Sequence, residues 1–267
     1  MGAVRRPPGW GLPATMAALG ALGAVALLVP LLGLVARAPW RDLPAVVADP
    51  VVGDALRLSL VCSLGALAIS TLLGVPLAWL FARAEFPGKA LVRALCLLPM
   101  VLPPVVGGVA LLLAFGRRGL IGQPIAQVFG VSLPFSTLGV VAAEAFVAMP
   151  FLVVTVEAGL RAMDRRYEDA AATLGASRWL AFRRVTVPLI GPSLGAGMAL
   201  CWARALGEFG ATITFAGNLQ GRTQTMPLAV YLALETRPDV AILLSLLLLA
   251  VSVAVLVALR QRLLGPR

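Results

Sequence analysis

The chain has 267 residues, of which 60% are hydrophobic and only 13% are charged, and its mean hydropathy is +0.95. Because a soluble domain is typically about 45–50% apolar and about 25% charged, this composition excludes an ordinary water-soluble protein and indicates an integral membrane protein. Histidine is absent, which excludes His-based catalysis and His-ligated metal sites. The net charge of +10 is explained better by basic loops on the cytoplasmic side of a membrane than by binding to nucleic acid.

Six apolar runs are long enough to cross a bilayer, whose core of about 30 Å needs roughly 20 residues of helix. The sequence therefore predicts an all-α membrane protein, with a single domain over residues 1–267 and spans at about 14–36, 58–82, 94–115, 137–156, 189–216 and 240–259. The three cysteines lie far apart within apolar runs, at Cys62, Cys96 and Cys201. We expect them to be packing residues, with neither a metal site nor a disulfide.

The distribution of basic residues predicts the orientation of the spans. Six spans place both termini on one side; with that side in the cytoplasm, the inner segments carry 14 basic residues and the outer segments carry 7. This bias predicts cytoplasmic N and C termini. A rival interpretation of the first run is a secretory signal cleaved near Ala36-Arg37-Ala38, but the run is longer than the 7–15 residues typical of a signal core, which favours a span.

The run at 94–115 contains three prolines, Pro99, Pro103 and Pro104. Each proline removes a backbone N–H donor and clashes with the preceding turn, so we expect this span to be kinked or broken. Irregular backbone at membrane depth is tolerated where it faces protein or a water-filled cavity. The functional interpretation is a helix that lines a pathway and bends during transport, and the alternative is a static packing helix.

The run at 189–216 has a small residue at every fourth position, which leaves one face almost without side chains: Gly191, Gly195, Ala199, Ala203, Gly207 and Ala211. Such a face either packs closely on another helix or borders a pore. Beside it lies a second series, Arg204, Glu208 and Thr212. A charge near the bilayer centre costs about 2.5–3.5 kcal/mol on insertion scales, so neither charged residue should face lipid. They form either an ion pair that locks helix packing or the gate of a polar pathway, with Glu144 as a candidate third member.

The inner segment 157–188 is the most highly charged part of the chain. Glu168 to Leu174 contains good helix formers after an acidic start, and Gly175 is placed to end that helix. The helix is flanked by Arg165, Arg166 and Arg178. It either projects towards a cytoplasmic partner or holds its arginines against anionic lipid headgroups.

This segment resembles the EAA loop of ATP-binding-cassette (ABC) importer permeases, in which E-A-A-x-x-x-G is followed, after nine intervening residues, by I-x-L-P. The matching residues are Asp169-Ala170-Ala171, Gly175 and Val185-x-Val187-Pro188. Asp169 stands where the motif has Glu, and Glu168 directly precedes it. The substitution keeps the charge and shortens its reach by one methylene.

The resemblance extends to the molybdate-type permeases, and it covers most of the chain from about Asp54 onwards. It is carried by four stretches: Leu98–Val105, Arg204–Thr212, Phe215–Asn218 and Gly221–Tyr231. Sulfate and thiosulfate permeases are close relatives, and tungstate is a further candidate substrate.

The resemblance implies a type I importer permease of MetI-like architecture in the bacterial inner membrane. It also implies a homodimer, two ATP-binding cassette subunits and an extracytoplasmic molybdate-binding protein. The chain has no G-x-x-x-x-G-K-[ST] loop, so we expect no catalysis and no bound cofactor of its own; ATP and Mg are used by the partner ATPase subunits. An intramembrane protease is disfavoured by the lack of His and of an Asp pair in the spans. A stand-alone channel would conduct without an ATPase.

Three candidate sites follow from the residues and the resemblance together. It assigns the coupling to the ATPase to Glu168, Asp169, Ala170, Ala171, Gly175, Ala176 and Pro188. The pathway or gate is expected at Pro99, Pro103, Pro104, Arg204, Gly207, Glu208, Gly210 and Thr212. On the outer side, Arg222 and Thr223 either touch the binding protein or form a plain polar loop. Glu208 has the wrong sign for a resting oxyanion site, so we interpret it as the partner of Arg204 or as a gate element.

Overall fold

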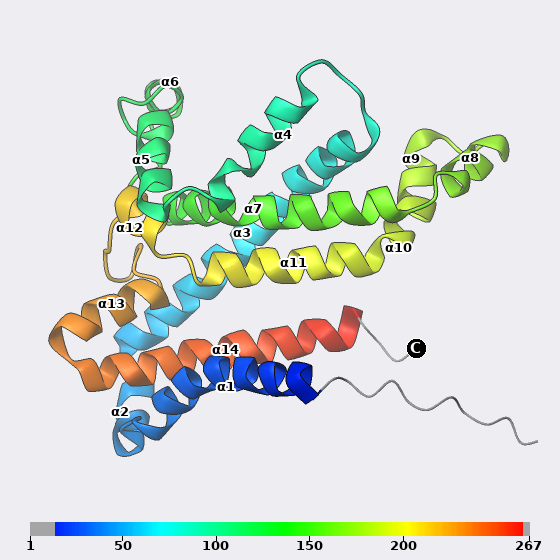
Figure 1. The fold of residues 1–267 in the computed structure, drawn as a ribbon. Coiled ribbons are helices and arrows are strands. Elements are labelled where there is room, and N and C mark those ends of the chain that lie inside the picture. Colours follow the sequence, from blue (N-terminus) through cyan, green and yellow to red (C-terminus); the bar gives the residue numbers. More distant parts are fainter. Residues whose placement is uncertain (1–13, 264–267) are drawn as a thin grey trace, which may run out of the picture.

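The computed structural model describes residues 14–263, and every regular element in that part of the chain is helical (Figure 1). Within this range four helices are long and apolar enough to cross a membrane: α1 (Ala14–Ala36), α3 (Pro50–Arg83), α7 (Thr137–Ala162) and the Pro238–Val255 part of α14 (Pro238–Leu263). Two bent helix pairs bring the number of spans to as many as six. They are Lys89–Met100 with α5 (Pro104–Phe115), and Arg178–Leu189 with α11 (Gly191–Leu206).

The remaining helices are short and connect or flank the long ones. They are η1 (Trp40–Asp42), α2 (Leu43–Val47), α4 (Lys89–Leu97), η2 (Leu98–Met100), α6 (Gly122–Phe129), α8 (Arg166–Thr173), α9 (Arg178–Ala181), the π-helix η3 (Phe182–Thr186), α10 (Val187–Leu189), α12 (Gly210–Ala216) and α13 (Met226–Thr236). We refer below to the α8 end and the α6 end of the bundle, which lie at opposite ends of α7 (Figure 1).

The helices differ from the predicted spans at several boundaries. Helix α3 begins at Pro50 and not near 58, because Asp49 caps it: its carboxylate accepts the N–H of Val51 at 2.9 Å. Helix α7 continues to Ala162 and not only to 156. The predicted location of the termini concerns residues 1–13 and 264–267, which lie outside the described residues.

Two predicted spans are not single straight helices. In the run 94–115, the segments before and after Pro103 are bent by 115°, since prolines at 103 and 104 interrupt the helical hydrogen bonds. The run 189–216 is also divided: α11 ends at Leu206 and α12 begins at Gly210. The four-residue spacing of Arg204, Glu208 and Thr212 predicts that they lie on one continuous helix. This prediction is wrong, because the break between α11 and α12 lies within the series.

The core of the bundle is formed by α3, α7 and α11, which pack together along most of their lengths. Small residues allow the close approach. A Cβ atom on Gly74 of α3 would lie 3.2 Å from Met149 of α7, and a Cβ atom on Gly197 of α11 would lie 3.1 Å from Leu152. Of the predicted small-residue face, Ala203 and Gly207 are exposed. That face therefore points away from the α3–α7 core at these positions.

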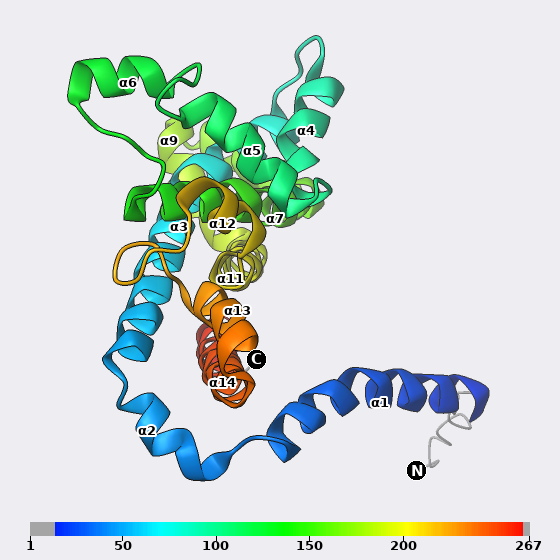
Figure 2. The same cartoon turned by 90° about the vertical axis from the view of Figure 1, so that its left-hand side faces the viewer.

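A second packed unit is formed by α13, α14 and the beginning of α3. Its buried residues include Ala55, Met226 and Leu243, and the Ser59 hydroxyl of α3 accepts the N–H of Met226 at 2.7 Å. Helix α1 contributes no buried residue and extends away from the body of the subunit (Figure 2). Its apolar surface is thus available to lipid or to another helix.

Ion pairs join α4 to α7 at the α8 end. Glu157 is 1% exposed, and its carboxylate accepts hydrogen bonds from Arg93 of α4 and Arg161 of α7, each at 2.9 Å. Arg161 also donates to the Phe81 carbonyl oxygen of α3 at 3.2 Å. A buried carboxylate is costly without such partners, so Glu157 holds three helices in one arrangement.

Replacement of Glu157 by Gln should lower the melting temperature of the detergent-purified protein, because the two arginines lose the charge that they share. A hydrogen bond to a charged group contributes about 1.5–3 kcal/mol. The matched control is Glu85→Gln, since the side chain of Glu85 is exposed and its pKa is lowered chiefly by its hydrogen bond to Lys89. The control should leave the melting temperature unchanged. Equal shifts in the two variants would contradict the structural role of Glu157.

Candidate functional site

The candidate coupling loop is the helix α8 with the turn that follows it, at the projecting end of the molecule (Figure 1). Gly175 has φ +83° and ends the helix, with the N–H of Ala176 bonded to the Ala171 carbonyl at 3.0 Å. Both ends of the helix present an apolar side chain to the outside: Tyr167 in its first turn is 57% exposed, and Leu174 after its last residue is 88% exposed. An exposed apolar turn on a rigid helix is suited to contact with another protein.

The two adjacent acids of α8 have different surroundings. Glu168 forms an ion pair with Arg83 at the end of α3, at 3.3 Å, and its other carboxylate oxygen accepts the Thr186 hydroxyl at 2.7 Å. Asp169 is exposed. The structure therefore brings Glu168 to the core of its own subunit and leaves Asp169 on the surface. Sequence reasoning missed Arg83 and Thr186, because a pair separated by 85 positions has no local signal.

The loop returns to the bundle through irregular helix. The π-helix η3 contains the buried Thr186, and Pro188 lies in the first turn of α10, directly before the 75° bend into α11. A cavity of about 370 Å³ between α8 and α3 is lined by Arg83, Glu168 and Thr186, among others. Glu168, the π-helix η3 and the start of α11 are thus connected to one another.

The candidate gate is the break between α11 and α12. Arg204 and Glu208 form an ion pair at 2.5 Å across it. The second oxygen of Glu208 accepts the N–H of Ala211 at 2.9 Å, which caps the first turn of α12. Glu208 is 1% exposed, so its side chain is packed inside the break.

The two broken segments lie against each other. A Cβ atom on Gly210 would be 2.5 Å from Cβ of Pro104, and a Cβ atom on Gly108 would be 2.5 Å from Thr214. Only glycine permits helices α5 and α12 to approach this closely. The structure therefore brings Pro104 and Gly210 together. The buried Thr212 lies on the same helix as Gly210, and Pro99 lies in the separate turn η2.

The remaining candidate residues lie on α7 and on the loop that follows α12. Glu144 of α7 is 1% exposed, and one of its carboxylate oxygens has no hydrogen-bond partner within the described chain. In the loop between α12 and α13, Arg222 is exposed, whereas Thr223 is fully buried and its hydroxyl accepts the Leu219 N–H at 2.9 Å. Of these two residues only Arg222 is accessible to another protein, because the buried Thr223 stabilises the turn from inside.

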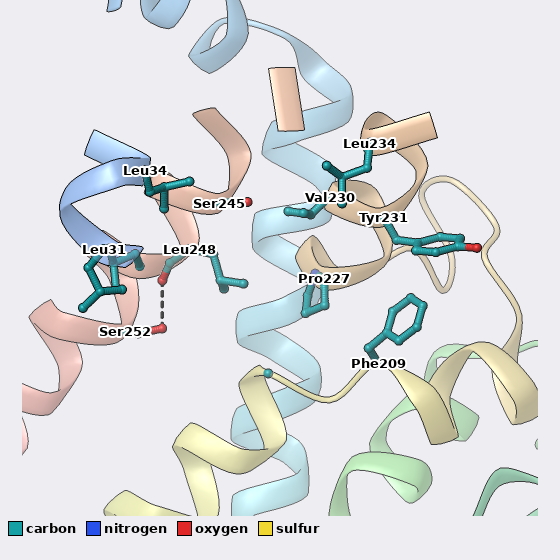
Figure 3. Close-up of a pocket in the computed structure, with 12 residues that line it drawn as sticks. Leu31, Leu34, Phe209, Pro227, Val230, Tyr231, Leu234, Ser245, Leu248 and Ser252 are labelled. Carbon is teal, nitrogen blue, oxygen red and sulfur yellow. Dashed lines mark hydrogen bonds between the residues drawn. The ribbon is translucent and has the colours of Figure 1, made fainter. Parts of the chain in front are cut away.

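A cavity of about 530 Å³ borders the break on its exposed side (Figure 3). Gly207 and Phe209 form one wall, and the rings of Phe209 and Tyr231 lie 5.1 Å apart. The opposite walls come from α1 and α14, through Leu31 and Leu248. The lining is mainly apolar, so this cavity offers the break space to move and provides no evident site for an anion.

Neutralising either member of the Arg204–Glu208 pair should destabilise the protein, because it leaves the other charge in a mostly buried position. Gln at position 208 still offers an oxygen to Ala211, so the two single variants and the double variant isolate the charge interaction. We expect the double variant to be more stable than the sum of the single costs predicts, by about 0.5–3 kcal/mol. Denaturant unfolding of the parent, the two single variants and the double variant measures this interaction energy. Strict additivity would contradict the pairing.

Comparison with known proteins places the chain among transport permeases. It is 45% identical over 240 residues to the molybdenum transport system permease protein ModB of Mycobacterium tuberculosis, with 90% of each chain covered. It is 47% identical over 183 residues to ModB of Haemophilus influenzae, covering 68% of this chain and 80% of that protein. The sulfate transport system permease protein CysT of Escherichia coli is 38% identical over 212 residues, covering 78% and 76%.

The fold and the family model agree with these relatives. The structure matches that of a bacterial ABC transporter involved in the import of the acidic polysaccharide alginate, with a TM-score of 0.74 and 15% identity over 93% of this chain and 94% of that chain. At this identity the match concerns the fold alone. Residues 74–267 match the family model of the binding-protein-dependent transport system inner membrane component. The chain therefore belongs to this family of inner-membrane transport components.

Proposed function

We propose that this chain is the permease subunit of an ATP-driven importer of molybdate, which accepts the oxyanion from an extracytoplasmic binding protein and releases it into the cytoplasm. The observation that carries the proposal is the 45% identity over 90% of the chain to a molybdenum transport permease. Sulfate is the second candidate substrate, supported by the 38% identity to a sulfate permease, and tungstate is a close chemical analogue of molybdate.

The proposed assembly is a homodimer with two ATPase subunits on the cytoplasmic side. The α8 end faces the cytoplasm in this arrangement, and both termini lie there too, in accord with the excess of basic residues predicted for the inner segments. The exposed apolar surface of α1 supports contact with a second copy within the membrane. ATP and Mg are held by the ATPase subunits, and this chain contributes movement and a pathway.

The coupling proposal rests on the different roles of the two acids in α8. Leu174, Tyr167 and Asp169 are exposed and would enter the ATPase surface. Glu168 faces the other way, towards Arg83 and Thr186, so a displacement of α8 is passed to α3 and to the start of α11. Closure of the ATPase dimer would then rock these helices as a rigid lever, which is one form of alternating access.

The far end of the same lever is the proposed gate. Helix α11 has 16 residues and is about 24 Å long, and it joins the bend at Gly191 to the break at Gly207. Movement of α11 would reposition the Arg204–Glu208 pair and the contact of Gly210 with Pro104. No strong oxyanion site is required at the break, because a transported ion must leave as readily as it enters.

Reconstitution tests the function and the substrate together. The chain, its ATPase and its binding protein are placed in liposomes, and ATP hydrolysis and uptake are measured with binding protein loaded with molybdate, tungstate or sulfate. We expect stimulation by molybdate-loaded protein and no uptake when the ATPase is omitted. Uptake without an ATPase would indicate a channel, and preferential stimulation by sulfate would indicate the sulfate permease.

If the turn after α8 couples the chain to the ATPase, backbone strain at Gly175 should reduce transport, whereas the same strain at another glycine should not. Gly175 and Gly88 both have positive φ, +83° and +78°, and a side chain at either would meet open space. A valine should therefore cost a similar strain of about 1–2 kcal/mol at each position. We expect Gly175→Val to reduce uptake per ATP hydrolysed and the control Gly88→Val to leave it unchanged. Equal losses would indicate general destabilisation, and no loss at Gly175 would remove the coupling role.

A further inference from the structure

A cavity at the α6 end of the bundle has a lining suited to an anion. It has a volume of about 450 Å³ and lies where the loop after α5, the residues before α7 and the loop after α12 meet. Its polar lining comes from Arg117, Ser132 and Arg222, and no acidic residue lines it. Helix α7 has 26 residues and is about 39 Å long, so this cavity lies a membrane thickness away from α8.

The arginines near this cavity lie outside the ion pairs found in the described part of the chain. Within residues 14–255, the salt bridges involve neither Arg117, nor its neighbour Arg118, nor Arg222. Residues 116–136 and 217–225 also contain no Asp or Glu. Short loops on the side opposite the cytoplasm usually carry few basic residues. Two of these arginines, Arg117 and Arg222, line the cavity, and their unneutralised charges are suited to an anionic ligand.

The structure holds the two lining arginines at the beginning of α7. Arg117 Nε donates to the Ser132 hydroxyl oxygen at 3.3 Å, and the Thr137 hydroxyl donates to the carbonyl oxygen of Arg222 at 2.9 Å. These contacts use one nitrogen of Arg117 and only the backbone of Arg222. The remaining N–H groups stay available for oxygen ligands, and the positive end of the α7 dipole adds to their field.

One wall of the cavity is held in an uncommon backbone conformation. Phe135 has φ +58°, which is unusual for a bulky residue. Gly217 lies against its ring, where an added Cβ atom would be 3.0 Å from the nearest ring carbon. The ring of Phe135 thus lines the same cavity as Arg117 and Arg222.

We infer that this cavity is an entry site for a tetrahedral oxyanion dianion, occupied after the ligand leaves the binding protein and before it reaches the gate. The inference rests on the proposed function and extends it to named residues. Two planar guanidinium groups and a hydroxyl match the oxygens of such an ion. The buried acids Glu144 and Glu208 near the break are unsuited to holding the same ion, so binding is favoured outside the gate.

Protection of an introduced thiol tests the site. Phe135→Cys is made in a Cys96→Ser background and assembled with the ATPase, without binding protein, in phosphatidylcholine vesicles. The rate of modification by a sulfonate-bearing thiol reagent is measured with and without tungstate. With tungstate at about ten times its dissociation constant, the reaction should slow about tenfold. Adding Arg117→Gln and Arg222→Gln should abolish this protection, whereas Arg118→Gln, at an exposed arginine outside the cavity lining, should retain it.

The other outcomes identify what would replace the inference. Absence of protection in the parent, or protection that persists without both arginines, would overturn it. Slow modification without tungstate, seen only in vesicles containing phosphatidylglycerol, would assign the site to a lipid phosphate. If tungstate gives no protection and the arginine variants only raise the binding-protein concentration needed to stimulate the ATPase, the arginines are a protein contact. Molybdate uptake by the complete parent transporter is measured in parallel, so failure of the entry site and failure of the importer function are distinguished.

Discussion

The contacts of the Glu168 carboxylate connect the parts of this subunit on which the proposed transport mechanism depends. One oxygen pairs with Arg83 at the end of α3, and the other accepts the hydroxyl of Thr186, next to the start of α11. The side chain of Arg83 is only 9% exposed, so the ion pair is shielded and favours one geometry. Without these contacts α8 would be a helix on a flexible loop, and movement at its surface would not reach the membrane helices.

The membrane environment explains why the other end of the lever is built from broken helices packed in protein. A helix that ends inside a bilayer leaves N–H and C=O groups that water cannot satisfy. Here Glu208 caps α12, and α5 packs against it through Gly108 and Gly210. The breaks are therefore tolerated because they face each other, and the cavity beside Gly207 provides room for them to rearrange.

Much of the helical layout could be predicted from apolar runs and helix-ending residues. The run at 137–156 lies within α7, and the turn at Gly175 follows from the rule that glycine adopts positive φ at helix ends. The break after Leu206 could not be predicted in this way. In a hydropathy profile, Gly207 to Phe209 belong to one long apolar run. The profile does not reveal that the Glu208 carboxylate accepts the N–H of Ala211 and so caps α12.

The candidate sites show the same division between local and distant information. Asp169, Gly175 and Pro188 were found from a spaced motif, and their coupling role stays a prediction. The partners that position them, Arg83 and Thr186, are selected by tertiary packing and have no spacing rule. The approach of Gly210 to Pro104 likewise joins positions more than 100 residues apart. Thr223 shows the opposite error, because a polar residue in a loop was expected at the surface and lies buried.

The most direct test of the rigid lever is a distance measurement within and between subunits of the assembled transporter. Spin labels are attached to Arg166→Cys in α8 and Leu72→Cys in α3, both at exposed positions. The account predicts that the distance between these two positions within one subunit stays constant when ATP is trapped, while the two copies of position 166 move closer together. A change in the distance within one subunit, with the two copies of position 166 unmoved, would contradict it.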